Sequence, residues 1–332
     1  MRYKELVARA VDRNIPLSVL LELTYRCDLD CFFCYNDRAS SGRPLSVAQY
    51  ESLFEGLRDL STMTLTFSGG EPLAHPSFFE LGARARKMGF VVRVKSNGNR
   101  LGETLARRLR DEVDPFVVEV SLHGASAATH ERQTRIPGSF ERLLANLEGM
   151  SGLGLRVQLN ASLTAWNEDE IEPMCALAER LGLLLRWNTQ ISPRDDGDRA
   201  PLALAPSPGA VRRLQEVLDE RRPTEMDLSD EAPPVPWSKY CGAASSGLTV
   251  DPWGNVYPCV QWRVPAGNLH QETVRDIWER SPALLAVRAR TQALATEQAG
   301  AVGGANARSC PALASAVAGE GRRWPITVAG QR

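Results

Sequence analysis

The sequence predicts an α/β fold built on a partial (β/α)6 barrel similar to the TIM barrel, followed by a small C-terminal extension. Between residues 17 and 191, six apolar runs with β-branched content alternate with segments of helical pattern. Parallel strands need such crossovers, and near-continuous apolar strands suit a sheet that is covered on both faces. Since the alternation stops near residue 192, the barrel is expected to end there.

The predicted elements follow one another in a regular order. A helix over residues 2–14 comes first. The strands are expected at residues 17–25, 64–67, 90–98, 115–124, 155–163 and 183–191. The helices between them are expected at residues 76–89, 102–113, 138–154 and 167–182. In such a barrel, functional side chains gather where strands end and βα loops begin.

The chain changes character after the sixth strand. Residues 192–209 are rich in proline, glycine and aspartate and predict a loop. A helix over 209–222 and a proline-rich stretch to 237 follow, and then residues 247–260 predict a hairpin that turns at Asp251–Asn255. A last helix is expected over 273–297, and the small residues of 298–320 leave order there open. We therefore divide the chain into a barrel (1–195), a linker with a helix (196–236) and a C-terminal domain (237–332).

Composition narrows the class of protein. Of the 332 residues, 43% are hydrophobic and 24% charged, which is enough for a sizeable core. With 39 basic and 40 acidic residues the net charge is −1, so nucleic acid is not a favoured partner. The charged N-terminal segment is no secretory signal, and no apolar run approaches the roughly 18 residues of a membrane span. A cytoplasmic protein is expected, in which clustered cysteines are metal ligands or redox groups.

Three of the seven cysteines, Cys27, Cys31 and Cys34, stand together in TYRCDLDCFFCYN at the end of the first predicted strand. Thiolates are soft ligands that suit iron–sulfur clusters, zinc and cuprous copper. Three of them can hold three corners of a cubic [4Fe–4S] cluster and leave one iron open to a ligand. The alternative is structural zinc, which prefers four ligands, and no nearby histidine or cysteine completes such a set.

This cysteine motif, with Phe33 before the third cysteine and Tyr35 after it, resembles that of the radical S-adenosylmethionine (SAM) superfamily. The resemblance implies that the open iron chelates the amino and carboxylate groups of SAM. It also implies that an electron from the reduced cluster cleaves SAM to methionine and a 5′-deoxyadenosyl radical, which abstracts hydrogen from a substrate.

Further motifs at predicted strand ends resemble SAM-contacting segments of the same family. In FSGGEP (67–72), Ser68, Gly69, Gly70 and Glu71 match the GGE motif, whose glycines allow close approach to a ligand and whose glutamate contacts the SAM amino group. Ser96 and Asn97 end the third strand, Ser121 and His123 end the fourth, and Asn160 lies on the fifth. The alternatives are turn chemistry for Asn97 and a surface position for His123.

The C-terminal cysteines resemble those of SPASM and twitch extensions, which bind auxiliary iron–sulfur clusters. Cys241, Gly254 and Cys259 match the opening of the pattern, the segment GNLHQETVRDIW (267–278) matches its usual continuation, and Cys310 matches a later position. One expected thiolate is missing. Three options stay open: one cluster on Cys241, Cys259 and Cys310 with an open or non-cysteine fourth site, a lost cluster on a retained fold, or a fourth ligand from Asn306 or a distant acid.

The remaining cysteine and three of the histidines are expected to have structural roles. Cys175 has helical spacing with leucines and is expected in the core. The histidines His75, His130 and His270 are expected in loops or on the surface rather than as ligands.

The resemblance implies a radical SAM enzyme. The segments ISPRDDGDRAPLAL (191–204) and VYPCVQWRVPAGNL (256–269) are similar to SPASM proteins that mature ribosomally made peptides by crosslinking, epimerisation or related C–H modification. Since only about sixteen residues precede the first strand, we expect a separate leader-binding protein, and a reductant such as flavodoxin or ferredoxin. The alternatives are dehydrogenation or rearrangement of a small metabolite, such as a sugar or a tetrapyrrole, and a non-catalytic metal-binding scaffold. The intact cysteine motif and Glu71 argue against the scaffold, and no catalytic acid or base can be assigned.

Overall fold

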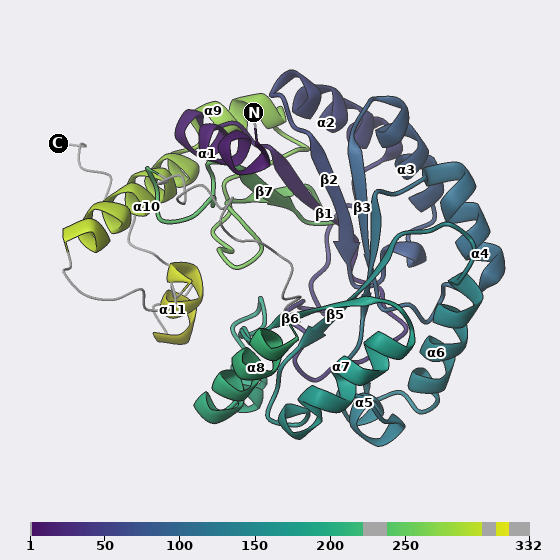
Figure 1. Ribbon diagram of the computed structural model, residues 1–332. Helices are drawn as coiled ribbons and strands as arrows, with labels where there is room; N and C mark the ends of the chain where they lie inside the picture. The colour runs from purple at the N-terminus through teal and green to yellow at the C-terminus, as the bar shows by residue number, and fades with distance from the viewer. Residues whose placement is uncertain (1, 222–237, 301–309, 319–332) are drawn as a thin grey trace.

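Nine strands form one curved sheet in the computed structural model, which describes residues 2–221, 238–300 and 310–318 (Figure 1). The strand order is β6-β5-β4-β3-β2-β1-β7-β8-β9, and the first six strands are parallel to their neighbours. These six strands confirm the predicted partial barrel. Their bounds are Ser18–Thr24 (β1), Thr64–Gly69 (β2), Val91–Ser96 (β3), Val117–Ser121 (β4), Val157–Ser162 (β5) and Leu184–Asn188 (β6).

Helices cover the outer face of the six-stranded part of the sheet (Figure 1). They are α2 (Val47–Asp59), α3 (Phe78–Lys87), α4 (Glu103–Arg108), α5 (Ala127–Thr134), α6 (Ser139–Met150) and α7 (Ile171–Arg180). The strand residues that face these helices are almost fully buried, as Val19, Phe67 and Val94 illustrate. Because side chains alternate along a strand, the intervening residues point to the inner face, where polar residues such as Thr66, Lys95 and Glu119 collect. The sheet therefore has an apolar outer side and a polar lumen.

The C-terminal extension continues the sheet of the barrel. The predicted hairpin is present as β7 (Gly247–Val250) and β8 (Asn255–Tyr257), and a short β9 (Gly267–Asn268) follows. The pairing of β7 with β1, parallel and in register from Ser18 and Gly247, was not predicted from the sequence. The consequence is that the strand leading to the first cysteine motif and the hairpin leading to Cys259 lie side by side.

Several helices differ from the sequence predictions. The helix α2 and the helix α5 were not predicted. The predicted helix 273–297 is two helices, α9 (Val274–Arg280) and α10 (Pro282–Gly300), because Pro282 lacks an N–H and its ring excludes the preceding residue from helical geometry. The predicted helix 102–113 is present as α4 followed by a π-helical turn, Leu109–Val113.

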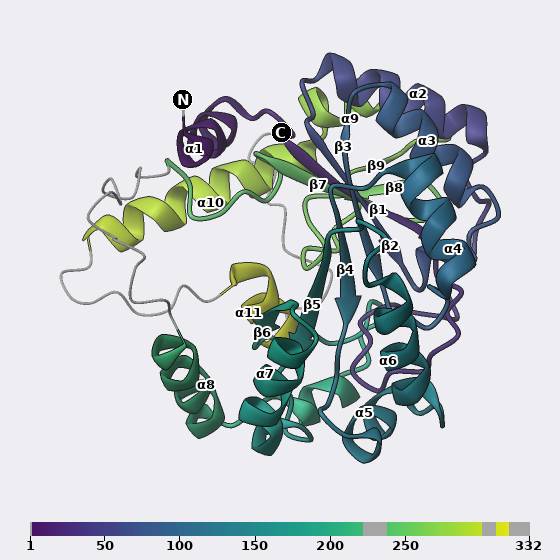
Figure 2. The ribbon, with the colours of Figure 1, turned by 45° about the vertical axis from the view of Figure 1, so that its right-hand side comes forward.

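Smaller elements frame the rest of the chain. The N-terminal helix α1 (Tyr3–Arg13) lies beside α10 in both views (Figures 1 and 2). The Trp278 indole of α9 donates to the carbonyl of Asn14, the residue that ends α1. The predicted loop 192–209 contains a 3-10 turn, Ala200–Leu204, and leads into α8 (Pro208–Glu220). The helix α11 (Pro311–Ala318) falls in the small-residue stretch. Residues 222–237 of the expected linker lie outside the described residues.

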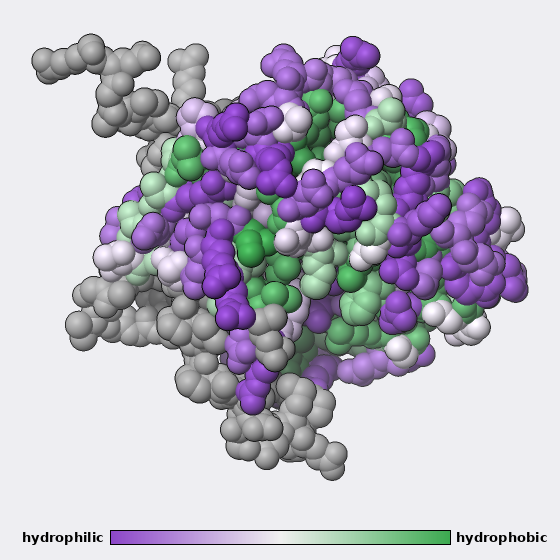
Figure 3. Space-filling view, turned by 90° about the horizontal axis from the view of Figure 1, so that it is seen from above, coloured by the Kyte–Doolittle hydropathy of each residue, from purple (hydrophilic) through white to green (hydrophobic). Residues whose placement is uncertain are grey.

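Polar residues cover most of the face seen in Figure 3, and hydrophobic residues reach the surface between them. Within the described ranges, no helix combines the length and the hydropathy that a membrane crossing requires.

Candidate active site

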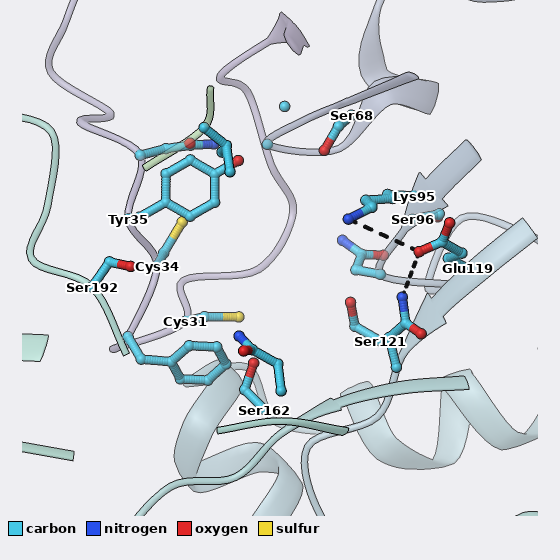
Figure 4. A pocket seen from close by; sticks show the side chains of 18 of the residues that line it. Cys31, Cys34, Tyr35, Ser68, Lys95, Ser96, Glu119, Ser121, Ser162 and Ser192 are labelled. Carbon is cyan, nitrogen blue, oxygen red and sulfur yellow. Dashed lines mark hydrogen bonds and ion pairs between the residues drawn. The ribbon is translucent and has the colours of Figure 1, made fainter. Parts of the chain in front are cut away.

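The carboxyl ends of the barrel strands surround a cavity of about 700 Å³ (Figure 4). This volume lies within the roughly 300–1,000 Å³ that is usual for small-molecule sites. The cavity is lined by the cysteine loop after β1, by the loops after β2, β3 and β4, and by β5, β6 and the segment that follows them. Of the residues predicted to bind the cofactor, all except Glu71 line it: Phe33, Tyr35, Ser68, Gly69, Gly70, Ser96, Asn97, Ser121, His123 and Asn160.

Cys27, Cys31 and Cys34 all line the cavity. Burial raises the pKa of the Cys31 thiol, and the neighbouring Cys34 and Cys27 raise it further, so both of these sulfurs lie within electrostatic reach of Cys31. No three histidine, cysteine, aspartate or glutamate side chains in the described part of the chain converge on a single metal ion. In an iron–sulfur cube each thiolate binds its own iron, so three thiolates on one loop can hold three corners. This all-sulfur set therefore fits a cluster better than it fits zinc.

The two glycines after β2 hold the start of the cysteine loop. The Gly70 N–H donates to the Thr24 carbonyl (2.6 Å), and the Glu71 N–H donates to the Arg26 carbonyl (2.8 Å). A Cβ atom on Gly70 would stand 2.5 Å from the Arg26 carbonyl oxygen, and Gly69 has φ +128°. Close packing against the cysteine loop is therefore a reason for the glycine pair that the sequence did not reveal.

Glu71 joins the end of β2 to the end of β3. Its buried carboxylate accepts hydrogen bonds from the Ser96 hydroxyl (3.0 Å) and from the backbone N–H groups of Asn97 (2.8 Å) and Leu73 (3.2 Å). Burial raises the pKa of this carboxyl to about 7 although these donors oppose the shift. The Asn97 amide in turn donates to the Asp28 carboxylate (2.8 Å) in the cysteine loop. The predicted SAM-contacting motifs thus form one connected structure around the cysteines.

Two buried histidines, His123 and His130, lie at the wall of the cavity that contains Phe33. The ring of Phe33 meets His123 edge-on, with 5.0 Å between ring centroids, and His130 lies behind His123 at 5.6 Å. The expected loop or surface position of His130 is wrong, since this side chain is only 1% exposed, and His123, for which a surface position was the alternative, is 7% exposed and lines the cavity. Burial lowers the pKa of His123 to about 3 and that of His130 to about 4, so both rings are neutral at pH 7.

A buried ion-pair network beside the cysteines was missed by the sequence reasoning. Glu22 on β1 is fully buried and accepts hydrogen bonds from the Tyr25 hydroxyl (2.9 Å), the Tyr35 hydroxyl (2.8 Å) and both terminal nitrogens of Arg263 (2.9 and 2.6 Å). Arg263 also pairs with Asp195 at 3.2 Å. The network ties the barrel, the cysteine loop, the segment after β6 and the C-terminal extension together. The available signal was an acidic residue inside the apolar strand LLELT.

The segment after β6, predicted only as a loop, holds the cysteine loop from the other side. The guanidinium of Arg194 donates to the carbonyls of Cys34 (3.0 Å) and Phe32 (2.8 Å), and the Asp195 N–H donates to the Tyr35 carbonyl (2.8 Å). The loop that carries the three thiols is therefore fixed by backbone contacts on both flanks.

The C-terminal cysteines also come together. Burial raises the pKa of the Cys259 thiol to about 12, and the neighbouring Cys310 and Cys241 contribute to the shift. All three side chains pack at the edge of the main core. Asn306, considered as a fourth ligand, lies outside the described residues. Cys175 is buried with Leu163 and Ile171 in a separate cluster, which confirms its expected core role.

Comparisons with known proteins agree with this architecture. The radical SAM superfamily model matches residues 21–178, and the model of the SPASM iron–sulfur cluster-binding domain matches residues 241–300. The solved structure of Streptococcus suis SuiB bound to its precursor peptide SuiA superposes with a TM-score of 0.68 at 14% identity and covers 86% of this chain and 70% of SuiB. This likeness supports the fold.

Curated relatives fall into two functional groups. The AdoMet-dependent heme synthase of Methanosarcina barkeri is 26% identical over 295 residues, which cover 81% of this chain and 83% of the synthase. The mycofactocin maturase MftC of Mycobacterium ulcerans is 29% identical, with coverage of 81% and 76%. The PqqA peptide cyclase of Ruegeria pomeroyi is also 29% identical, with coverage of 82% and 76%.

A partial barrel with three thiols at its mouth and a cysteine-bearing extension is the architecture of an iron–sulfur enzyme. Residues 21–178 form a radical SAM domain and residues 241–300 a SPASM domain. The protein is therefore an enzyme that uses a [4Fe–4S] cluster and SAM, with auxiliary iron–sulfur binding in the SPASM domain.

Proposed function

We propose that this enzyme matures a ribosomally synthesised peptide by abstracting hydrogen from one of its residues and so forming a crosslink, an epimer or a related product. The observation that carries the proposal is the open cavity of about 700 Å³ between the cysteine loop and the C-terminal extension, which has room for a peptide side chain beside the cofactor. Similarity to a maturase and to a peptide cyclase supports it.

In this proposal Cys27, Cys31 and Cys34 hold the cluster. The residues proposed to contact SAM are Phe33, Tyr35, Ser68, Gly69, Gly70, Ser96, Asn97, Ser121, His123 and Asn160, and Glu71 holds Ser96 and Asn97 from behind. When bound and reduced, the cluster and SAM supply a 5′-deoxyadenosyl radical. The chain itself orients the ligand through the Glu71–Ser96–Asn97 hydrogen bonds, and the Phe33–His123 contact closes one wall against water.

The auxiliary site of the proposal consists of Cys241, Cys259 and Cys310, with a fourth ligand that is not cysteine. We retain the division into a barrel (1–195), a linker (196–236) and a C-terminal domain (237–332). A flavodoxin or ferredoxin as reductant, a separate leader-binding protein and a cytoplasmic location complete the proposal, and the seven unpaired cysteines suit a reducing compartment.

A second candidate is oxidation or rearrangement of a tetrapyrrole. The similarity to a heme synthase favours it, at 26% identity and over a larger share of the relative than for the maturases. A tetrapyrrole and a peptide differ in protease sensitivity and size, and a single assay can separate them.

The test measures the transfer of deuterium from the substrate to 5′-deoxyadenosine. Cells that encode the protein are grown in deuterated medium, and their extract is separated into peptide-sized and small-metabolite fractions. Each fraction is incubated with reconstituted enzyme, dithionite and unlabelled SAM. We expect deuterium in 5′-deoxyadenosine only from the peptide fraction, and loss of the transfer after protease treatment. Transfer from the small-metabolite fraction that resists protease would contradict the peptide proposal and favour the alternative.

A further inference from the structure

The lumen of the barrel contains a chain of polar side chains that crosses four strands. Arg93 on β3 donates to Glu119 on β4 (2.9 Å), and Asn160 on β5 also donates to Glu119 (2.7 Å). The chain continues from Gln158 to Asn160 (2.9 Å) and from Arg186 on β6 to Gln158 (2.9 Å). Sheet register supports this order, because Glu119 is the neighbour of Gln158 and Asn160 is the neighbour of Arg186. Figure 4 shows Lys95 pointing toward Glu119.

Positive charge exceeds negative charge along this chain. Arg93 and Lys95 share the single carboxylate of Glu119, at 2.5 and 3.9 Å. Burial raises the pKa of that carboxyl, but Lys95 and Arg93 more than offset the effect and leave the pKa below its usual value, so Glu119 is ionised. Arg186 bonds only a neutral amide through Nε, and within the described residues no carboxylate pairs with it. Three cations therefore face one anion.

The position of these charges relates them to both cysteine sets. The cavity of about 700 Å³ contains Cys27, Cys31 and Cys34, and a second cavity of about 520 Å³ contains Cys259. Arg93, Lys95 and Glu119 line both cavities. The cation-rich part of the lumen thus lies between the predicted SAM site and the predicted auxiliary site, where a substrate would have to pass or bind.

We propose that Arg186, Lys95 and Arg93 form a carboxylate-binding site for the substrate. The terminal nitrogens of the Arg186 guanidinium bond no acid among the described residues, so they can bind a carboxylate by donating two parallel hydrogen bonds to it, and Lys95 adds a positive charge. The proposal rests on the proposed function, because it takes the ligand to be a peptide. The carboxylate is then either the C-terminus of the peptide or an aspartate or glutamate side chain, and the two sources share the same chemistry.

Three pools of random N-acetylated hexapeptides test the site. The first pool lacks aspartate and glutamate and ends in a free carboxylate, the second is its C-terminal amide, and the third is an amide pool with one glutamate in each peptide. Each pool is mixed with anaerobically reconstituted enzyme and SAM, and the peptides retained on the protein are quantified by mass spectrometry. We expect the first or the third pool to be retained about tenfold better than the second, the difference that one charge-assisted contact provides.

Variants connect the discrimination to Arg186. Arg186→Gln should abolish the preference for carboxylate, while Arg186→Lys should retain part of it because the charge remains. The matched control is Arg156→Gln, since Arg156 also bonds only neutral groups, the carbonyls of Pro115 and Phe116, and lies away from the cavity. Iron content and SAM affinity must be unchanged in all three variants, which shows that they fold and that Arg186 does not act on SAM.

Equal retention of acid and amide pools would overturn the carboxylate site and leave the peptide function standing. Retention of no pool would overturn the carboxylate site, whereas the peptide function fails only if deuterium transfer from the peptide fraction is also absent. Loss of SAM affinity in Arg186→Gln, with the peptide preference unchanged, would overturn the site and assign Arg186 to the cofactor.

Discussion

The buried pair of Glu22 and Arg263 gives the sharpest stability prediction. Arg263→Met removes two charge-assisted hydrogen bonds to a carboxylate that stays buried with only the hydroxyls of Tyr25 and Tyr35 as donors. At about 1.5–3 kcal/mol per hydrogen bond to a charged group, two bonds amount to about 3–6 kcal/mol, which agrees with the roughly 3–5 kcal/mol usual when one partner of a buried pair is removed. Glu22→Gln should cost less, about 2–3 kcal/mol, because Arg263 keeps Asp195.

The assay is a double-mutant cycle in which urea unfolding of each variant is monitored by circular dichroism under anaerobic conditions. The double variant should be at least about 1 kcal/mol more stable than the sum of the two single effects predicts, because each single change leaves a partner uncompensated. The control is Arg107→Met, which breaks an exposed pair with Glu103 and should cost about 0–1 kcal/mol. An Arg263→Met effect no larger than the control, or strict additivity of the single effects, would refute the reasoning.

Three further predictions concern the cysteine loop, the histidines and the auxiliary site. Gly70→Ala should lower the iron bound and the rate of SAM cleavage, because its Cβ would stand 2.5 Å from the Arg26 carbonyl oxygen. The control Gly149→Ala should change neither, because a Cβ there has nothing within 4 Å. Normal iron content in Gly70→Ala would be inconsistent with this packing. The ordinary pKa of a histidine is 6.5, and burial in the folded state lowers it to about 3 for His123 and about 4 for His130. Below pH 6.5 the unfolded state therefore binds more protons than the folded state. As a result, the free energy of unfolding should fall by about 1–2 kcal/mol between about pH 6.5 and 5.5. The double change of both histidines to glutamine should flatten this dependence in urea titrations, and an unchanged slope would count against buried neutral rings. Cys310→Ala should remove the iron of one cluster and leave SAM cleavage in place, whereas Cys175→Ala should keep all iron; equal iron in both variants would argue against an auxiliary cluster.

The sequence predicted the elements with strong local patterns and missed those that depend on long-range packing. The six barrel strands and the β7–β8 hairpin follow from apolar runs and turn residues, and the cysteine motifs from their spacing. The pairing of β7 with β1 joins residues more than two hundred positions apart, and nothing local encodes it. The same holds for the bonds from Arg263 to Glu22 and from Arg194 to the cysteine loop, since each needs the fold before the partner is known.

The sequence predicted which residues gather at the candidate site better than it predicted the role of each residue. Ten of the eleven residues predicted to contact SAM line the cavity, because strand ends of a barrel meet at one edge. Glu71 instead lies behind the wall and holds Ser96 and Asn97 in place. The charge of the lumen was not predicted, because Arg93, Glu119 and Arg186 stand on three different strands, and only the sheet register brings them into one row.

The most direct test is the reductive cleavage of SAM by the cluster that the three N-terminal thiolates would hold. Enzyme reconstituted anaerobically with iron and sulfide is mixed with dithionite and SAM, and 5′-deoxyadenosine is quantified for the natural chain and for the variant in which Cys27, Cys31 and Cys34 are alanine. The account predicts 5′-deoxyadenosine from the natural chain and none from the variant. Equal amounts from both proteins, or none from a fully iron-loaded natural chain, would contradict it.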